Sequence, residues 1–163
     1  LLFNKDKKTK NPTVRIHSSC LTGDLMGSQK CDCGYQLETA LDYMSKSKKM
    51  NILIYLNQEG RGLGIHNKII SYNIQEKGWD TYQADNILGF SGDERDYKAA
   101  AEILKFFKVK KLNLITNNPE KVEYLKKNKI TVNKMIKIKP GINPHNKRYL
   151  ETKKIIGKHL LNL

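Results

Sequence analysis

Short apolar segments alternate with amphipathic ones along the chain, and this alternation restricts the possible fold more than any other feature. Apolar runs of about four to eight residues bounded by turn residues are typical of buried strands, whereas apolar residues at every third or fourth position are typical of helices. Strands that alternate with helices predict a mixed sheet flanked by helices. We therefore expect an α/β (α+β) fold, with ligands bound where strands end and loops begin.

The boundaries of these elements follow from the same pattern. Asp93 is placed to cap one helix, and Asn118 with Pro119 to open the next, because proline at the first helical position costs no hydrogen bond. A loop is expected over residues 79–92, and its length suggests a functional role. We predict strands at 13–18, 51–56, 112–116 and 130–138, and further helices at 34–47, 65–77 and 149–161.

The size of the chain indicates a single compact domain over residues 1–163 with its own hydrophobic core. No apolar run approaches the roughly 18 residues that a membrane helix needs, and the odd number of cysteines argues against a disulfide framework. These features predict a soluble, cytoplasmic protein. Because the chain starts at Leu1 without a methionine or a secretory signal, we expect a truncated N-terminus or preceding residues that are missing.

The charge balance favours polyanionic partners. The chain has 30 Lys and Arg residues against 16 Asp and Glu residues, a formal net charge of +14. Such a charge attracts nucleotides or nucleic acid. The lysines are scattered among Asn and Ile, however, which is also typical of a biased proteome with solvated lysine surfaces. Charge alone therefore does not choose a ligand.

Three cysteines form the strongest candidate metal site. Cys20, Cys31 and Cys33 lie close in sequence, and the last precedes a predicted helix, whose N-terminus favours the thiolate form that binds metal. Structural zinc sites use four protein ligands, whereas catalytic sites use three and keep one position for water. Three cysteines thus indicate an open site. His17 as a fourth ligand would make it a closed structural site, and three unrelated buried thiols are a further alternative.

The glycine-rich segment 58–64 follows a predicted strand and opens a helix. Its backbone N–H groups and Arg61 could hold a phosphate. It matches neither the P-loop nor the dinucleotide-binding pattern, so a purely structural turn explains it equally well. Glu59 would repel phosphate but could accept hydrogen bonds from the edge of a base.

The acidic segment 93–96 brings three carboxylates and Arg95 to the predicted start of a helix. A general base and a phosphate clamp could lie together there. Helix capping explains the same residues, because acidic side chains favour the first turn. Tyr72 on the preceding helix is likewise compatible with packing or with chemistry.

Taken together, these segments resemble GTP cyclohydrolase II. The resemblance keeps its order and nearly constant spacing from about residue 13 to residue 161, and so covers almost the whole chain. The segments that carry it are 15–24, 31–34, 58–64, 89–90, 93–96 and 116–119.

The resemblance implies a reaction and its cofactors. The family converts GTP and water into a diaminopyrimidinone ribosylamine phosphate, formate and pyrophosphate, the first step of riboflavin biosynthesis. Cys20, Cys31 and Cys33 match the family's zinc ligands, which leaves His17 outside the ligand set. Zinc would lower the pKa of water so that it attacks C8 of guanine, and Mg²⁺ would accompany the triphosphate.

The resemblance also assigns roles to individual side chains. Asp93 matches the proton acceptor, Tyr72 a residue near the reacting centre, and Arg95 the proposed nucleophile towards the α-phosphate. A guanidinium stays protonated, so we expect Arg95 instead to stabilise the departing pyrophosphate. The positions that match nucleotide contacts are Arg15, Gln36, Glu59, Gly60, Arg61, Thr81, Thr116 and Lys121.

Two further hypotheses remain open. Ser19 stands where the family usually has glutamate, which suggests a paralogue that releases only pyrophosphate or acts on another base. A zinc-stabilised, basic nucleic-acid-binding module is the alternative of another class. As for partners, the resemblance implies a homodimer and permits an upstream dihydroxybutanone phosphate synthase domain.

Overall fold

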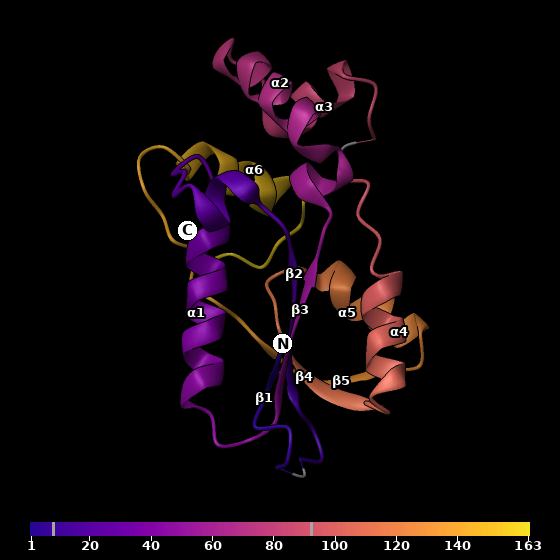
Figure 1. The fold of residues 1–163 in the computed structure, drawn as a ribbon. Coiled ribbons are helices and arrows are strands. Elements are labelled where there is room, and N and C mark those ends of the chain that lie inside the picture. Colours follow the sequence, from indigo (N-terminus) through magenta and orange to yellow (C-terminus); the bar gives the residue numbers. More distant parts are fainter. Residues whose placement is uncertain (8, 92) are drawn as a thin grey trace. The chain divides into compact units, whose positions relative to one another are not determined.

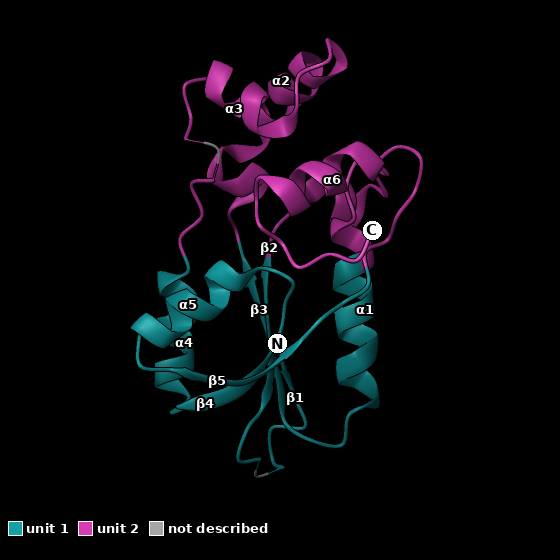
Figure 2. Cartoon of the chain, turned by 180° about the vertical axis from the view of Figure 1, so that it is seen from behind, with its two compact units in different colours: residues 1–17, 36–56, 97–139 teal, residues 18–35, 57–96, 140–163 magenta. Residues whose placement is uncertain are grey.

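The computed structural model describes residues 1–7, 9–91 and 93–163. The chain forms two compact units, each assembled from segments that are distant in sequence (Figure 2). Unit 1 consists of Leu1–His17, Gln36–Leu56 and Tyr97–Lys139, and unit 2 of Ser18–Tyr35, Asn57–Asp96 and Pro140–Leu163. Among the described residues, none of the helices has the length and apolar character needed to cross a membrane.

Unit 1 is built on a five-stranded mixed sheet with the strand order β1-β3-β2-β4-β5 (Figure 1). β1 is antiparallel to β3, whereas β4 is parallel to both β2 and β5. This mixed sheet confirms the predicted fold class. The strands are β1 (Leu2–Phe3), β2 (Thr13–Ser18), β3 (Asn51–Leu56), β4 (Lys111–Ile115) and β5 (Thr131–Ile136).

Helices cover both faces of this sheet (Figures 1 and 2). Because successive side chains of a strand point to opposite faces, Leu114 of β4 joins one apolar cluster and Ile115 the other. The first cluster includes Leu104 of α4 (Lys98–Phe106) and a leucine of α5 (Pro119–Lys127), and the second includes Met44 of α1 (Cys33–Lys46). The regular apolar spacing of these segments explains why their positions were predictable.

The start of α5 confirms the prediction for Asn118 and Pro119. The Asn118 side chain accepts a hydrogen bond from the backbone N–H of Glu120 at 2.9 Å, and Pro119 is the first helical residue. The helix ends at Lys127. Local capping chemistry therefore determined this boundary.

Unit 2 contains short helices and turns. A π-helical turn, η1 (Leu21–Leu25), follows Cys20, and a 3-10 turn, η2 (Glu59–Gly62), precedes α2. The helices are α2 (Gly64–Glu76), α3 (Thr81–Ile87) and α6 (Lys147–Ile155).

The prediction of a loop over residues 79–92 is wrong for its central part, which forms α3. The Asp80 side chain accepts hydrogen bonds from the N–H groups of Tyr82 and Gln83, and the Gln83 side chain accepts one from Asp80 N–H in return. This capping box stabilises the start of a helix too short to show clear apolar periodicity. The predicted loop end at Gly92 lies outside the described residues.

Two further boundaries differ from the prediction. α4 begins at Lys98 rather than at Asp93, because the Asp93 carboxylate pairs with Arg95 instead of capping a helix. The C-terminal helix α6 ends at Ile155 rather than near residue 161. His159 N–H donates to the carbonyl of Lys153 at 3.2 Å and closes the chain into a turn there.

Candidate metal centre and active site

The three cysteine sulfurs of unit 2 form one group. The Sγ atoms of Cys20, Cys31 and Cys33 all lie within 4.8 Å of one another, and those of Cys20 and Cys31 are 3.6 Å apart. Two sulfurs that each lie about 2.3 Å from one tetrahedral zinc ion are about 3.8 Å apart. The donor set and its spacing therefore fit zinc, and among the described residues this is the group that could hold a metal.

Two glycines let the backbone pack tightly around the sulfurs. A Cβ atom at Gly23, in η1, would lie 2.8 Å from the Cys31 Sγ and 3.0 Å from the Cys20 Sγ. A Cβ atom at Gly34 would lie 2.3 Å from the carbonyl oxygen of Gly23. Real Cβ atoms do not approach other atoms this closely. Glycine at both positions is thus a condition for this arrangement of thiols.

The pKa values of the three thiols differ. The pKa of Cys20 is lowered because Cys31 and Cys33 hydrogen-bond to it, with a further contribution from the nearby Lys68 ammonium. The same hydrogen bonds to Cys20 raise the pKa of Cys31 to about 11 and that of Cys33 well above its ordinary value. A bound divalent cation would release the remaining protons, since thiolates are the metal-binding form.

His17 belongs to unit 1 and has partners there. Its Nδ1 atom lies 3.2 Å from an Arg15 nitrogen, and its ring stacks on Tyr55 with 5.5 Å between centroids. The ring is buried, with 2% of its surface exposed. These contacts explain His17 as an interior residue, in agreement with a metal group of three cysteines.

The C-terminal segment of unit 2 holds the loop that carries Cys31 and Cys33. The side chain of Asp32, between them, is fully buried and forms an ion pair with Lys153 of α6 at 3.4 Å. Asn146 is also fully buried and donates to the carbonyl oxygens of Gly141, at 2.7 Å, and Cys31, at 3.5 Å. Sequence reasoning missed the contacts of Asp32 with Lys153 and of Asn146 with Cys31, because the two residues of each pair are more than 100 positions apart.

Lys68 is a further residue whose contacts the sequence did not predict. From α2 its Nζ atom donates to the Cys20 Sγ at 3.1 Å, to Thr22 Oγ1 at 2.8 Å and to Glu59 Oε1 at 2.7 Å. Lys68 precedes the predicted Tyr72 by four residues, so both lie on one face of the helix. That spacing was the available signal for Lys68.

Tyr72 lies in the same neighbourhood, and its role near the reacting atoms stays a prediction. The Lys68 Nζ atom is 5.8 Å from the centre of its ring. Burial raises the pKa of the Tyr72 hydroxyl, although Lys68 opposes the shift, and Thr22 hydrogen-bonds to it. The hydroxyl is therefore protonated at neutral pH and available as a donor.

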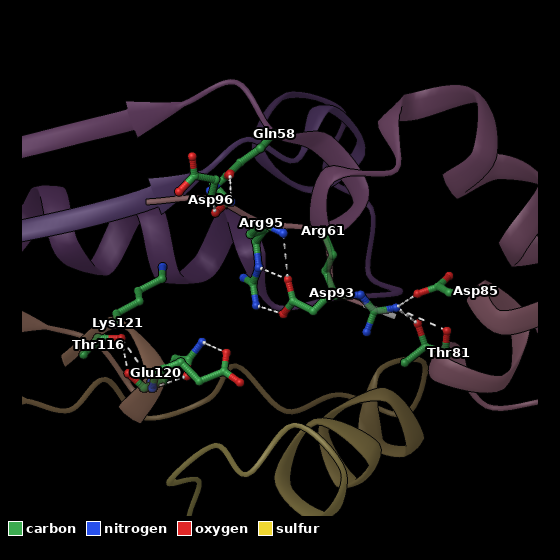
Figure 3. A network of polar contacts seen from close by, with 12 residues as sticks. Gln58, Arg61, Thr81, Asp85, Asp93, Arg95, Asp96, Thr116, Glu120 and Lys121 are labelled. Carbon is green, nitrogen blue, oxygen red and sulfur yellow. Dashed lines mark hydrogen bonds and ion pairs between the residues drawn. The ribbon is translucent and has the colours of Figure 1, made fainter. Parts of the chain in front are cut away.

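The glycine-rich segment forms a strained turn that directs Arg61 towards α3. Gly60 and Arg61 have φ angles of 59° and 61°, a left-handed conformation that costs a residue with a side chain about 1 kcal/mol or more. The Arg61 guanidinium donates to Thr81 Oγ1 at 2.5 Å and pairs with Asp85 (Figure 3). Asp85 also accepts from Ser71 at 2.9 Å, and burial raises its pKa in spite of Arg61.

The acidic segment lies beside this turn. Glu94 N–H donates to the carbonyl of Arg61 at 2.9 Å, and a Cβ atom at Gly62 would lie 2.9 Å from the Glu94 carbonyl oxygen. Arg95 and Asp93 form a two-pronged ion pair, in which Arg95 Nε lies 2.7 Å from Asp93 Oδ1 (Figure 3). The structure thus joins the predicted proton acceptor directly to the predicted phosphate-stabilising residue.

Ser19, which replaces the glutamate of the family pattern, has a buried hydroxyl. Its Oγ atom has no hydrogen-bond partner among the described residues.

Four of the predicted nucleotide contacts belong to unit 1. Arg15 donates to the Gln36 side chain at 2.8 Å, and Lys121 to the carbonyl oxygen of Ile16 at 2.8 Å. Thr116 Oγ1 accepts from the backbone N–H of Asn118 at 3.0 Å. All four residues are at least nine-tenths buried. Their proposed contacts with a nucleotide stay predictions, as do those of Glu59, Gly60, Arg61 and Thr81 in unit 2.

Comparison with known proteins shows the family of this chain. Residues 1–137 match the family model described as GTP cyclohydrolase II. A Helicobacter pylori protein named GTP cyclohydrolase-2 is 50% identical over 154 residues, which are 94% of this chain and 78% of the relative.

Relatives from other bacteria show the same similarity. The Psychromonas ingrahamii protein of that name is 49% identical over 94% of this chain and 76% of its own length. The Blochmanniella pennsylvanica protein is 51% identical over 86% of this chain and 70% of its own length. The matched range 1–137 spans the positions of all three cysteines, and the chain belongs to the GTP cyclohydrolase II family of hydrolases.

Proposed function

We propose that this chain hydrolyses GTP in a zinc-dependent reaction that opens the imidazole ring of guanine and releases formate and pyrophosphate. The remaining product is a diaminopyrimidinone ribosylamine phosphate, and the reaction is the first step of riboflavin biosynthesis. The observation that carries the proposal is the group of three cysteine sulfurs within 4.8 Å of one another in a chain of this family.

Cys20, Cys31 and Cys33 would hold the metal and leave one position for water or substrate. When bound there, zinc supplies a Lewis acid that lowers the pKa of water towards neutrality. The chain's own contribution is a closely packed loop, since Gly23 and Gly34 let the backbone approach the sulfurs. Lys153 and Asn146 support the same loop from α6 and its cap.

The ion pair between Asp93 and Arg95 suggests how these two residues divide their roles. In the structure Arg95 donates two hydrogen bonds to the Asp93 carboxylate, so these two side chains are engaged with each other. We infer that the triphosphate draws Arg95 away from Asp93. Asp93 is then available to accept a proton, and Arg95 stabilises the charge on the departing pyrophosphate.

Tyr72 would act as a hydrogen-bond donor near the reacting atoms. Its raised pKa keeps the hydroxyl protonated at neutral pH. Family membership further supports Mg²⁺ bound with the triphosphate, a homodimer and a cytoplasmic location, and is compatible with a fused dihydroxybutanone phosphate synthase domain.

One experiment tests the proposal against its alternatives. The purified chain is analysed for metal and then incubated with GTP and Mg²⁺, while formate and pyrophosphate are measured separately. Equal amounts of both products are expected. Zinc-loaded protein that releases neither product would contradict the proposal, and strongly salt-dependent nucleic-acid binding would then favour the zinc-stabilised binding module.

A second candidate is an enzyme with altered output, because Ser19 stands where the family pattern has glutamate. Such an enzyme would release pyrophosphate without formate. In that case Ser19→Glu is expected to restore formate release, whereas an unchanged product ratio in that variant would exclude Ser19 as the cause.

A further inference from the structure

Lys68 is a buried charged residue to which neither the sequence pattern nor the family resemblance assigned a role. Its side chain is 10% exposed, and the side chain of its partner Glu59 is 11% exposed. Lysine is rarely buried unless its charge is paired. The choice of partners therefore indicates what the side chain does.

The three hydrogen-bond donors of the ammonium group have three acceptors. These are Cys20 Sγ at 3.1 Å, Thr22 Oγ1 at 2.8 Å and Glu59 Oε1 at 2.7 Å. A lysine needed only for the ion pair with Glu59 would not have to contact a sulfur. The contacts hold the side chain in one direction and also compensate its charge.

Glu59 connects this lysine to the backbone on both sides. Its carboxylate accepts from Leu21 N–H, next to Cys20, and from Gly60 N–H in η2. The ion pair thus fastens the turn that carries Cys20 to the start of the glycine-rich segment. Lys68 is the member of this network that contacts a sulfur.

We propose that Lys68 is a positioning residue of the metal centre, which holds the Cys20 sulfur in place and offsets the negative charge of the three thiolates. A divalent cation bound by three thiolates leaves one net negative charge in a partly buried site, and a neighbouring cation stabilises it. A hydrogen bond to sulfur also reduces the electron density that the thiolate donates to the metal. The inference rests on the proposed metal site.

The test compares three variants of the full chain. Lys68→Met keeps the length of the side chain and removes the charge, and Lys68→Arg keeps the charge. Lys77→Met removes an exposed lysine from the end of the same helix and is the matched control. Zinc affinity is measured by competition with a chromogenic chelator, and the cobalt-substituted proteins are compared by absorption spectroscopy.

Lys68→Met is expected to weaken zinc binding about 10- to 100-fold, the usual effect of losing a residue that supports a metal ligand. Its sulfur-to-cobalt charge-transfer band is expected to shift to longer wavelength, because the sulfur loses a hydrogen bond. Lys68→Arg should retain most of the affinity, and Lys77→Met all of it. Wild-type affinity and an unshifted band in Lys68→Met would overturn the inference.

If Lys68→Met fails to fold because Glu59 is left without its partner, the double variant Glu59→Gln, Lys68→Met removes both charges and gives the same readouts. Weakened zinc binding in the double variant supports the inference, and wild-type binding contradicts it. Neither readout depends on turnover. A chain that binds zinc but releases no formate from GTP would refute the proposed function and leave this inference standing.

Discussion

The two units of this chain have opposite kinds of interior. Both apolar clusters among the described residues belong to unit 1, where helices cover the sheet, and its ion pairs Lys46–Asp42 and Lys105–Glu102 are exposed. In unit 2 the pair Lys30–Glu76 is exposed as well, but four other ion pairs among the described residues are mostly buried and connect loops and helices. Apolar burial therefore organises unit 1, whereas paired charges and thiols organise unit 2.

The largest expected effect is the loss of a thiol from unit 2. Cys31→Ala removes one of three ligands, and we expect zinc affinity to fall on the order of a hundredfold or more, with formate release lost. Zinc content after gel filtration and the GTP assay measure both effects. Cys31→Ala protein that retains stoichiometric zinc would show that the cysteines are not the ligands.

In unit 1 the change that corresponds to the loss of a thiol is the loss of a buried apolar side chain. Leu104→Ala in α4 leaves a cavity in a fully buried position, and we expect the free energy of unfolding to fall by about 2–5 kcal/mol. Urea denaturation measures it. Zinc affinity of the folded variant should equal that of the wild type, and a marked loss of affinity would contradict this separation of roles.

The ion pairs allow a direct comparison. Asp85→Ala leaves the mostly buried guanidinium of Arg61 without its partner and is expected to cost about 3 kcal/mol. Asp42→Ala, which breaks an exposed pair on α1, is expected to cost less than about 1 kcal/mol. Thermal and urea unfolding of the two variants test the difference. Equal costs would mean that burial does not distinguish the pairs of the two units.

Small and equal effects are expected where the two units are alike. Asn118→Ala removes the cap of α5 in unit 1, and Asp80→Ala removes the cap of α3 in unit 2. Each is expected to lower the free energy of unfolding by about 1 kcal/mol, because a side-chain cap satisfies the same backbone N–H groups in any helix. A much larger loss for Asp80→Ala would indicate that the position of α3 also supports Arg61.

The same contrast explains how far the sequence could predict the structure. The strand 51–56 and the opening of α5 at Asn118 were predictable because apolar spacing and capping are local. α3 was missed because seven residues are too few to show periodicity, although its capping box was present. The prediction that Asp93 caps a helix was wrong because its carboxylate pairs with Arg95. The pattern of acidic residues before a helix does not reveal this pairing.

The candidate metal ligands were predictable because three cysteines within fourteen positions are conspicuous in any sequence. Their supporting residues were not. Lys68, Asn146 and Lys153 act through partners that are 48, 115 and 121 residues distant, and only folding brings such pairs together. Lysines are so common in this chain that residue type does not reveal the buried ones, and only the four-residue spacing from Lys68 to Tyr72 offered a signal.

The contact between Asp32 and Lys153 has a consequence for how occupancy of the site can be read. If α6 stabilises the loop that carries the ligands, then a metal that orders this loop must stabilise α6 by the same free energy, because such coupling is reciprocal. Metal binding should then slow tryptic cleavage after the basic residues of α6, Lys147, Arg148, Lys153 and Lys154. The rate of cleavage within α6 would therefore report whether the metal is bound.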